Sequence, residues 1–300
     1  MKNRIIATMG FVLCLSFSVQ AQQELRSTVQ NVAATLKDVA PKDTTSGWKH
    51  TVITGINLGQ VALKNWSAGG ENSVSGNFYL NGSLDYVKNK WYWDNLLGLE
   101  YGLTYSEQNG WRKNADKIAL ASKIGYQINT KWSYAFLVDF YTQFVKGYNY
   151  PNTDEYISTF MAPAYSNVAL GINYKPDDKF SFFFSPITAR MTFVLDDSLS
   201  YAKAFGMNED QKFRMETGAY FVGTAKLTVM ENVELISKLD MFTPYNDRFG
   251  NIDVNWETLI NFKINKLLSA NLSTTVRYYE SEIKKVQFKE IFGLGFVYTF

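Results

Sequence analysis

Few residues in this chain of 300 are suited to acid–base or nucleophilic chemistry. Its one histidine, His50, shares an alternating face with Trp48 and Val52. A histidine that acts as a base works with a serine or aspartate held beside it. A position on an outward-facing apolar face offers neither, so we interpret His50 as structural. The one cysteine, Cys14, lies inside an apolar N-terminal stretch. The sequence therefore predicts no catalytic residue, and we expect a protein that is not an enzyme.

Charged residues at the polar positions of alternating segments form a second group. They are acids and bases of both signs: Glu100, Lys123, Asp139, Lys238 and Glu257. We expect the first three, on neighbouring strands, to lie at similar mid-membrane height, and Lys238 and Glu257 to form another pair of opposite charges on later strands. Opposite charges in an enclosed space tend to pair, and the pairs either fill that space as structure or line a polar channel. Mixed signs form no single-signed ring of the kind that ion-selective pores use, which favours the structural interpretation without excluding the channel.

Two acidic pairs form a third group. Asp196-Asp197 and Glu209-Asp210 have the oxygen ligands that a divalent cation prefers, and such a cation could bridge to lipopolysaccharide phosphates. Acidic pairs in an exposed loop are usually solvated charge. We therefore predict no resident metal and no cofactor.

The elements that must position these residues begin after an N-terminal leader. Two basic residues precede the apolar stretch 5–17, and Val19-Gln20-Ala21 is a small-residue cleavage site, so we predict a signal peptide over residues 1–21. Its removal takes away Cys14 and every disulfide or thiolate site. Residues 22–47 carry apolar residues at helical spacing and then a polar linker. This pattern predicts a periplasmic extension, either a short amphipathic helix or a disordered tail.

Charge and composition exclude several classes of protein. The chain has 30 Lys and Arg against 28 Asp and Glu, and loss of Lys2 and Arg4 with the signal peptide leaves 28 of each sign. A neutral chain lacks the concentrated basic surface that binding nucleic acid requires. Aromatic residues make up 16% of the chain while the mean hydropathy is −0.19. This combination is typical of transmembrane strands with one lipid-facing and one polar face.

Period-two alternation recurs in about twelve segments, each long enough to cross an outer membrane when tilted. In the clearest one, Asp139 lies opposite an apolar face made of Trp132, Tyr134, Phe136, Val138 and Phe140. The segments begin near Trp48, Ser73, Trp91, Asp116, Trp132, Ser166, Lys179, Lys212, Val233, Ile252, Leu268 and Val286. The sequence thus predicts an all-β fold, a transmembrane antiparallel up-and-down β-barrel of about 12 strands over residues 48–300.

Short and long connections alternate between these segments. Turn-favouring residues mark the short connections, at 88–90, 129–131, 176–178, 231–232 and 265–266. The other connections are expected at 62–72, 108–115, 145–165, 195–211, 244–251 and, shorter, 280–285. Outer-membrane barrels have short periplasmic turns and long extracellular loops, so we expect a bacterial outer-membrane location with both termini in the periplasm. A soluble β-sandwich, the alternative, explains neither this alternation nor the aromatic residues that flank the short turns.

The first long connection has an unusual composition, with a tryptophan and a tandem glycine among side-chain amides. It contains Asn65, Trp66, Gly69, Gly70, Glu71 and Asn72. Such a segment either folds inward as a constriction, with the glycines allowing positive φ, or forms a rigid cap over the barrel mouth.

The last segment alternates up to an aromatic C-terminal residue, through Phe296, Tyr298 and Phe300. This ending looks like the signal by which outer-membrane assembly machinery recognises its clients. Together with the loop Asn65–Asn72, it resembles an uncharacterised outer-membrane family, domain-of-unknown-function family 3078 (DUF3078). The resemblance covers about residues 47–300 and implies a β-barrel of a Gram-negative outer membrane, in contact with its lipid and lipopolysaccharide. It implies no substrate and no catalytic residues.

These observations support two hypotheses of different classes. The first is a narrow channel for small polar solutes, shaped by the loop Asn65–Asn72 and the inward charges. The second is a closed barrel that acts as a structural or accessory subunit of an outer-membrane complex, with a protein partner bound through residues 22–47 or the long loops. A lipid-active enzyme is disfavoured because the chain has one histidine.

Overall fold

The structure is a computed structural model that describes residues 46–63, 71–150, 152–246, 249–264, 268–279, 283–296 and 298–299. The predicted signal peptide and nearly all of the predicted periplasmic extension lie outside the described residues. Among the described residues, no helix combines the length and the apolar composition needed to cross a membrane.

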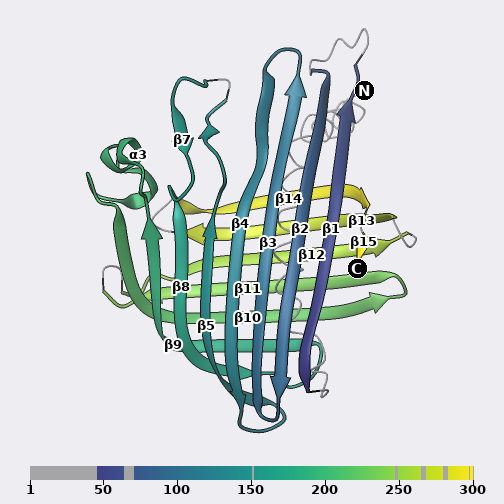
Figure 1. Cartoon of the computed structure of the whole chain (residues 1–300), viewed down its shortest axis with the longest axis vertical. Coiled ribbons are helices and arrows are strands. Elements are labelled where there is room, and N and C mark those ends of the chain that lie inside the picture. The colour runs from purple at the N-terminus through teal and green to yellow at the C-terminus, as the bar shows by residue number, and fades with distance from the viewer. Residues whose placement is uncertain are drawn as a thin grey trace, which may run out of the picture.

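Long antiparallel strands, each paired with its neighbour in the chain, make up the sheet (Figure 1). A further short strand, β15 (Tyr298–Thr299), continues the last long strand after one residue and pairs with the first, at Ile53↔Thr299 and Thr54↔Tyr298. The prediction of about twelve strands in up-and-down order is confirmed. The long strands are β1 (Gly47–Val61), β2 (Ser73–Lys88), β3 (Trp91–Ser106), β4 (Gly110–Gln127), β5 (Trp132–Thr142), β8 (Ala164–Tyr174), β9 (Phe180–Phe193), β10 (Phe213–Met230), β11 (Val233–Pro244), β12 (Asp253–Lys263), β13 (Leu268–Tyr279) and β14 (Ile283–Phe296).

Connections at one end of the barrel, the short-turn end, are tight. Asn89 and Asn232 adopt positive φ, 54° and 62°, in the turns after β2 and β10, a conformation that asparagine tolerates better than most residues. The opposite, long-loop end carries the hairpin of β6 (Gly147–Tyr148) and β7 (Tyr156–Ser158). It also carries the helices α3 (Asp197–Tyr201) and η2 (Ala204–Gly206), and Figure 1 shows β7 and α3 at this end.

One predicted loop is wrong. Residues 108–115 were expected to form a long connection, but β3 and β4 are joined by the three residues between Ser106 and Gly110. The register shifts where Gly102 pairs with Ala115 and Leu103 pairs with Lys113, which leaves Asn114 as an extra residue in β4. A β-bulge of this kind interrupts period-two alternation, so a polar stretch that belongs to a strand resembles a loop in the sequence.

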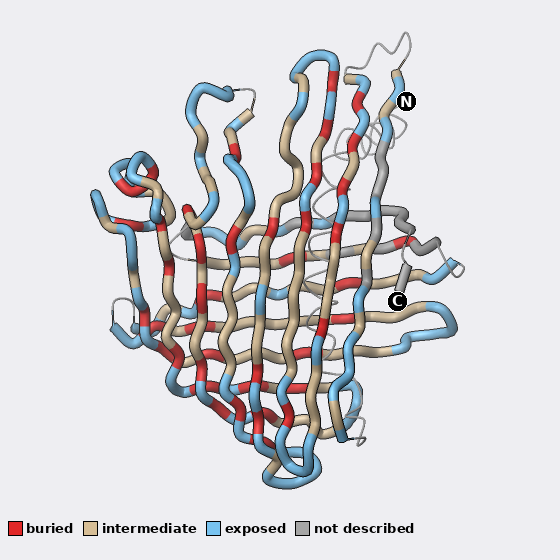
Figure 2. The backbone as a smooth tube through the Cα atoms, in the orientation of Figure 1, coloured by how far each residue is buried: buried red, intermediate tan, exposed pale blue. Residues whose placement is uncertain are grey.

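The two faces of the sheet have the opposite polarity to those of a soluble protein: the buried face is polar and the exposed face is apolar. In β2, Ser75 and Asn77 are buried, whereas Val74 and Phe78 on the other face are 54% and 46% exposed. Figure 2 shows buried and exposed positions alternating along several strands. A soluble sandwich would bury the aromatic face and expose the polar one. An outward apolar face around a polar interior is the arrangement of an outer-membrane β-barrel.

Aromatic rings form contacts across neighbouring strands at both ends of the outward face. The predicted aromatic residues next to the short turns pair as Trp91–Tyr126 and Trp132–Tyr174, with ring centroids 5.1 and 4.3 Å apart. Near the long-loop end, Tyr105 and Trp111 lie 5.2 Å apart. Ten residues of a strand tilted by about 45° rise about 23 Å, close to the thickness of an outer-membrane apolar band. Two such aromatic rows are typical of membrane interfaces.

Polar side chains on the outward face form hydrogen bonds with one another. The Trp93 indole N–H donates to the Ser122 hydroxyl at 2.8 Å, and that hydroxyl donates to the Asn95 amide oxygen at 2.8 Å. The Trp256 indole likewise donates to Ser237 at 2.9 Å. A polar group facing hydrocarbon costs several kcal/mol when it has no partner, so these pairs make outward polar residues tolerable.

The interior contains an apolar cluster between β5 and β11. It is built from buried residues of five strands: Ala135, Ala169, Phe183, Tyr220 and Phe242. On the neighbouring strands β3 to β5, the Tyr92 ring lies over Gly125, where an added Cβ would clash with the ring, and the Tyr92 hydroxyl is 3.0 Å from Ser133 Oγ. Glycine is therefore needed at position 125 for this close approach.

We expect Leu120→Arg to destabilise the folded barrel. Leu120 is 46% exposed on the outward face of β4, about midway between Tyr126 and Asp116, and an arginine at the bilayer midplane costs about 2–4 kcal/mol. The loss is measured by denaturant unfolding of the protein refolded in lipid vesicles. Gln108→Arg in the tight turn after β3 is the matched control, and equal effects of the two substitutions would contradict the assignment of the lipid face.

Candidate functional site

The inner wall of β2, β3 and β4 carries a buried acid next to a buried base. Glu100 and Lys117 are register partners on β3 and β4 and are 1% and 6% exposed. Asn77 on β2 donates to Glu100 Oε1 at 2.6 Å. Lys117 has the same parity as Lys123 but is not among the predicted inward residues, because the strand is expected from the sequence to begin only near Asp116.

Lys123 lies closer to the short-turn end than Glu100. Its register partner is Asp94, and Lys123 Nζ is 3.9 Å from Asp94 Oδ2. The expectation that Glu100, Lys123 and Asp139 lie at similar height is therefore wrong for the first two, which are separated by six residues along the ladder. The tight turn between β3 and β4 fixes this register. The partner of Asp139 is an asparagine. The backbone N–H and the side-chain amide of Asn167 donate to the Asp139 carboxylate at 2.9 and 3.0 Å.

The wall of β11 and β12 repeats the pairing of acid and base. Lys238 and Glu257, the predicted pair, are register partners, and Lys238 Nζ lies 3.2 Å from Asp240 Oδ1. Asp240 also accepts a hydrogen bond of 2.8 Å from the Tyr220 hydroxyl. Asn255 donates to Glu257 at 3.0 Å. Each charge on this wall thus has a neighbour of opposite sign or a hydrogen-bond donor.

Arg190 links two strands that are not neighbours. Its guanidinium is 2.9 Å from Asp253 Oδ2 on β12 and 3.8 Å from the ring centroid of Phe242 on β11. Arg190 is not among the residues predicted from the sequence, because Pro186 occupies a bulge in β9, where the register shifts between Ile187 and Phe184. After that bulge the inward positions change parity. No signal in the local pattern of β9 identifies the new parity.

The two walls are close enough for their charges to interact, yet the space between them is open to solvent. Tyr141 on β5 is 41% exposed. The charges of Glu100 on one wall, and of Glu257 and Arg277 on the other, all act on its hydroxyl. A side chain that is surrounded by charges from several strands and still accessible must project into an unfilled interior. We call this interior the lumen.

The predicted constriction loop is described only in part. Asn65, Trp66, Gly69 and Gly70 lie outside the described residues, so the choice between constriction and cap stays a prediction. Glu71 forms an ion pair of 2.7 Å with Arg112, which joins the start of β2 to the β3–β4 hairpin. Asn72 accepts a hydrogen bond from the Leu63 backbone. These two residues close the base of the loop.

The pKa of Glu71 is lowered below its ordinary value. Burial raises the pKa of this carboxyl, but hydrogen bonds from Ser106, Asn109 and Arg112 and the charge of Arg112 outweigh that effect. The ionised form is therefore the one that holds the link between the loop and the hairpin.

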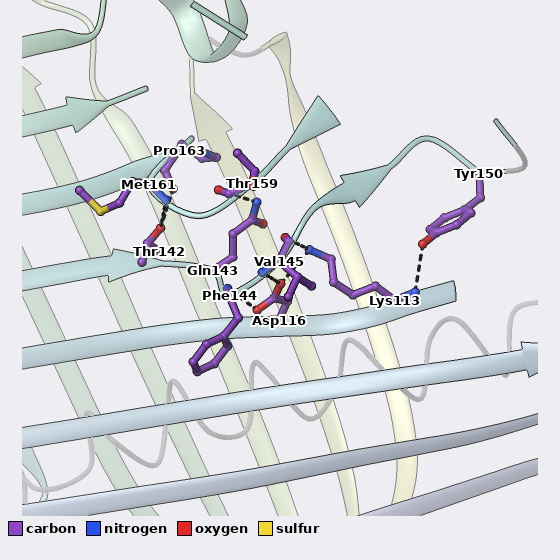
Figure 3. Close-up of polar contacts among 10 residues, drawn as sticks. All are labelled: Lys113, Asp116, Thr142, Gln143, Phe144, Val145, Tyr150, Thr159, Met161 and Pro163. Atoms are coloured by element: carbon purple, nitrogen blue, oxygen red, sulfur yellow. Dashed lines mark hydrogen bonds and ion pairs between the residues drawn. The ribbon is translucent and has the colours of Figure 1, made fainter. Parts of the chain in front are cut away.

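The loop between β5 and β8 is fastened to the outside of β4 (Figure 3). The Asp116 carboxylate accepts from the backbone N–H groups of Phe144 and Val145 at 2.7 and 2.9 Å. Lys113 donates to Asp116 at 2.8 Å and to the Val145 carbonyl at 2.8 Å, and its own N–H donates to the Tyr150 hydroxyl. This group, Lys113 with Asp116, holds the first part of the loop against the wall.

The acidic pairs are engaged by protein groups. Asp196 caps α3 by accepting from the Leu199 N–H at 3.0 Å, and it also accepts from the Tyr156 hydroxyl at 2.9 Å. Asp197 pairs with Lys212 and Glu209 with Lys203. Within the described residues, no three His, Cys, Asp or Glu side chains are grouped as a metal site would require.

The remaining predicted residues lie on the first and last strands. His50 is exposed on β1 opposite Leu84, which is 46% exposed on the outward face. Phe296 ends β14 and Tyr298 begins β15 beside β1, whereas Phe300 lies outside the described residues. Their proposed part in assembly stays a prediction.

Substitution of Asp116 should release the loop. Asp116→Ala removes three hydrogen bonds, each worth about 1.5–3 kcal/mol when charge-assisted, so we expect trypsin to cleave after Lys146 at least about tenfold faster than in the unsubstituted protein. Asp154→Ala, in the same loop but exposed, is the control. Equal cleavage of the two variants would show that Asp116 does not hold the loop.

The link made by Glu71 should depend on pH. A lowered pKa means that its contribution is present above the ordinary value of 4.5 and is lost as the pH falls through the lowered value. For an exposed pair we expect a contribution on the order of 0.5 kcal/mol. The measurement is the difference in unfolding free energy between the unsubstituted protein and Glu71→Gln, in urea, as a function of pH. A difference that does not shrink at low pH would contradict the link.

The chain resembles a family of unknown function and, at low similarity, several solved barrels. The translocator domain of the autotransporter NalP from Neisseria meningitidis is 8% identical, with 94% of this chain and 99% of that chain covered and a TM-score of 0.44. The CymD monoaromatic hydrocarbon channel is 11% identical, with 91% of this chain and 92% of that chain covered and a TM-score of 0.37. The NanC porin is 5% identical, with 82% of this chain and 98% of that chain covered and a TM-score of 0.36. Likenesses this low carry no inference about what this chain binds or moves.

No curated protein sequence matches the chain. The model of Protein of unknown function (DUF3078) matches residues 58–148, from the outer part of β1 to β6. This span contains the loop Asn65–Asn72. The predicted resemblance to DUF3078 is confirmed over this part of the chain.

Proposed function

We propose that this outer-membrane barrel is a narrow, water-filled channel for small polar solutes. The observation that carries the proposal is that polar and charged side chains on both inner walls remain accessible to solvent. Tyr141 on β5 is 41% exposed, and the side chains of Lys238 and Asp240 on β11 are 24% and 15% exposed. Burying such groups in a dry packed interior is costly, whereas water in the lumen would hydrate them.

The arrangement of charges on the walls supports passage of polar solutes that carry little net charge. Acids and bases alternate on both walls, as in Glu100 beside Lys117 and Lys238 beside Glu257. No single sign dominates, so we expect weak ion selectivity. Ordered water around these charges disfavours entry of apolar molecules, because they offer no replacement for its hydrogen bonds.

A closed accessory barrel is the second candidate, and the apolar cluster with Arg190 favours it. Phe183, Tyr220 and Phe242 occupy the interior beside β9 to β11, and Arg190 reaches past them to Asp253. Such filling reduces the cross-section. In this alternative the predicted extension 22–47 and the long loops contact a protein partner, which crosslinking from residues 22–47 in cells would capture.

Orientation and the absence of catalysis belong to the same proposal. The short-turn end is placed in the periplasm with both termini, and the α3 and β7 loops face outward. Trypsin added to intact cells should then cleave the long loops and leave the short turns intact. We propose no reaction, because the chain has one histidine and it lies on β1.

Single-channel conductance of the refolded chain from residue 22 onward, in a planar lipid bilayer, tests the proposal. A water-filled lumen predicts discrete ohmic current steps. A barrel that is folded, as judged by its resistance to denaturant, but silent would contradict the channel and favour the accessory subunit. Removal of residues 22–47 from a silent barrel then separates a plugged lumen from a filled one.

Lys123→Met should shift ion selectivity towards cations. The positive charge of Lys123 balances the negative charge of Asp94 at the inner wall, so its removal leaves the carboxylate with no nearby positive charge from Lys123. The measurement is the reversal potential in a salt gradient. Lys131→Met, in the exposed turn after β4, is the control that changes the same net charge outside the lumen, and identical reversal potentials for both variants would contradict the place of Lys123 in the conduction path.

A further inference from the structure

The middle of the lumen carries acids and bases on facing walls. We define the mid-lumen belt as Lys117 and Tyr141 on one wall and Lys238, Asp240 and Glu257 on the other. Lys117 has Glu100 as its register partner, and Lys238 has Glu257. The charges of Glu257 and Lys238 act on Lys117 from across the lumen. Each wall therefore carries an acid and a base that face each other on adjacent strands.

Groups of the belt are accessible from the lumen. Tyr141 is 41% exposed, and the side chains of Lys238 and Asp240 are 24% and 15% exposed. The Lys117 ammonium lies 5.7 Å from the Tyr141 ring centroid, so the phenol shields the buried ammonium on its own wall. A solute in the belt meets a phenol on one side and a partly buried lysine with two carboxylates on the other.

This arrangement discriminates among solutes by the number and sign of their charges. An ion of either sign is attracted by one member of each pair and repelled by the other. A neutral amide makes hydrogen bonds but no ion pair. A solute with one ammonium and one carboxylate can align antiparallel to the pair Lys238–Glu257, because its carboxylate meets the ammonium and its ammonium meets the carboxylate, and both contacts are charge-assisted hydrogen bonds.

On the first wall, Asn77 donates to Glu100, the register partner of Lys117, and so helps to hold that carboxylate beside the lysine. We propose that the mid-lumen belt is a binding site for small zwitterions, solutes that carry one ammonium and one carboxylate. The inference rests on the proposed channel and specifies the class of solute that passes through it.

Block of the ion current tests this inference. The protein from residue 22 onward is placed in a planar bilayer at neutral pH, and the current is recorded while glycine is added. We expect glycine to reduce the current in a saturable way. Glycolamide, a neutral molecule of similar size, should reduce it only as far as it lowers bulk conductivity. Equal effects of the two solutes in a conducting protein would overturn the belt and leave the channel standing.

Variants locate the site. Lys238→Met and Glu257→Gln should each raise the glycine concentration for half block by at least about tenfold, while Lys226→Met should leave it unchanged. Lys226 is the control because it pairs with Glu234 at 3.7 Å near the short-turn end. Tyr141→Phe, which keeps the shape of the side chain, should weaken block without loss of folding. Unchanged block in Lys238→Met, Glu257→Gln and Tyr141→Phe would overturn the site, and a silent unsubstituted protein would overturn the channel itself.

Discussion

Backbone hydrogen bonding in hydrocarbon is the constraint on which this structure depends. Lipid offers no partner to a peptide N–H or C=O, so each strand must be paired on both sides. The up-and-down sheet addresses this requirement with antiparallel ladders between successive strands. The first strand gains a second partner at the seam where β15, which follows β14 in the chain, pairs with β1 over Ile53↔Thr299 and Thr54↔Tyr298. Among the described strands of this sheet, that seam has the shortest ladder, and it involves the aromatic C-terminal segment.

The same solvent inverts the usual distribution of residues. Lipid accepts the aromatic and aliphatic face, so serine, asparagine and charged residues are directed inward. Close packing inside then depends on small residues as much as on large ones. Gly125 lies beneath Tyr92, and Gly218 lies beneath the Phe242 ring. Polar residues left on the outward face, such as Trp93 with Ser122, form hydrogen bonds with each other because lipid offers them none.

Local pairing governs the interior charges. Lys123 with Asp94, Lys238 with Asp240 and Arg190 with Asp253 each combine opposite signs on nearby strands. Pairing of this kind compensates the cost of removing charge from bulk water and gives the walls a defined arrangement. It also leaves little net charge along the lumen. The proposed passage of small polar solutes, and of zwitterions in particular, rests on this balance of charge.

The strand count, the inward or outward direction of most side chains and the turns follow from the amino-acid sequence, because alternation and turn chemistry are local properties of the chain. The segment from Trp132 to Phe140 shows this most clearly. Other features depend on pairing between strands and are visible only in the folded structure. The bulge at Asn114 turned an expected loop into β4, the bulge at Pro186 brought Arg190 inward, and the register of β3 with β4 paired Glu100 with Lys117 instead of placing it level with Lys123. A bulge adds one residue that only the partner strand reveals, and register fixes height, so neither can be obtained from period-two alternation.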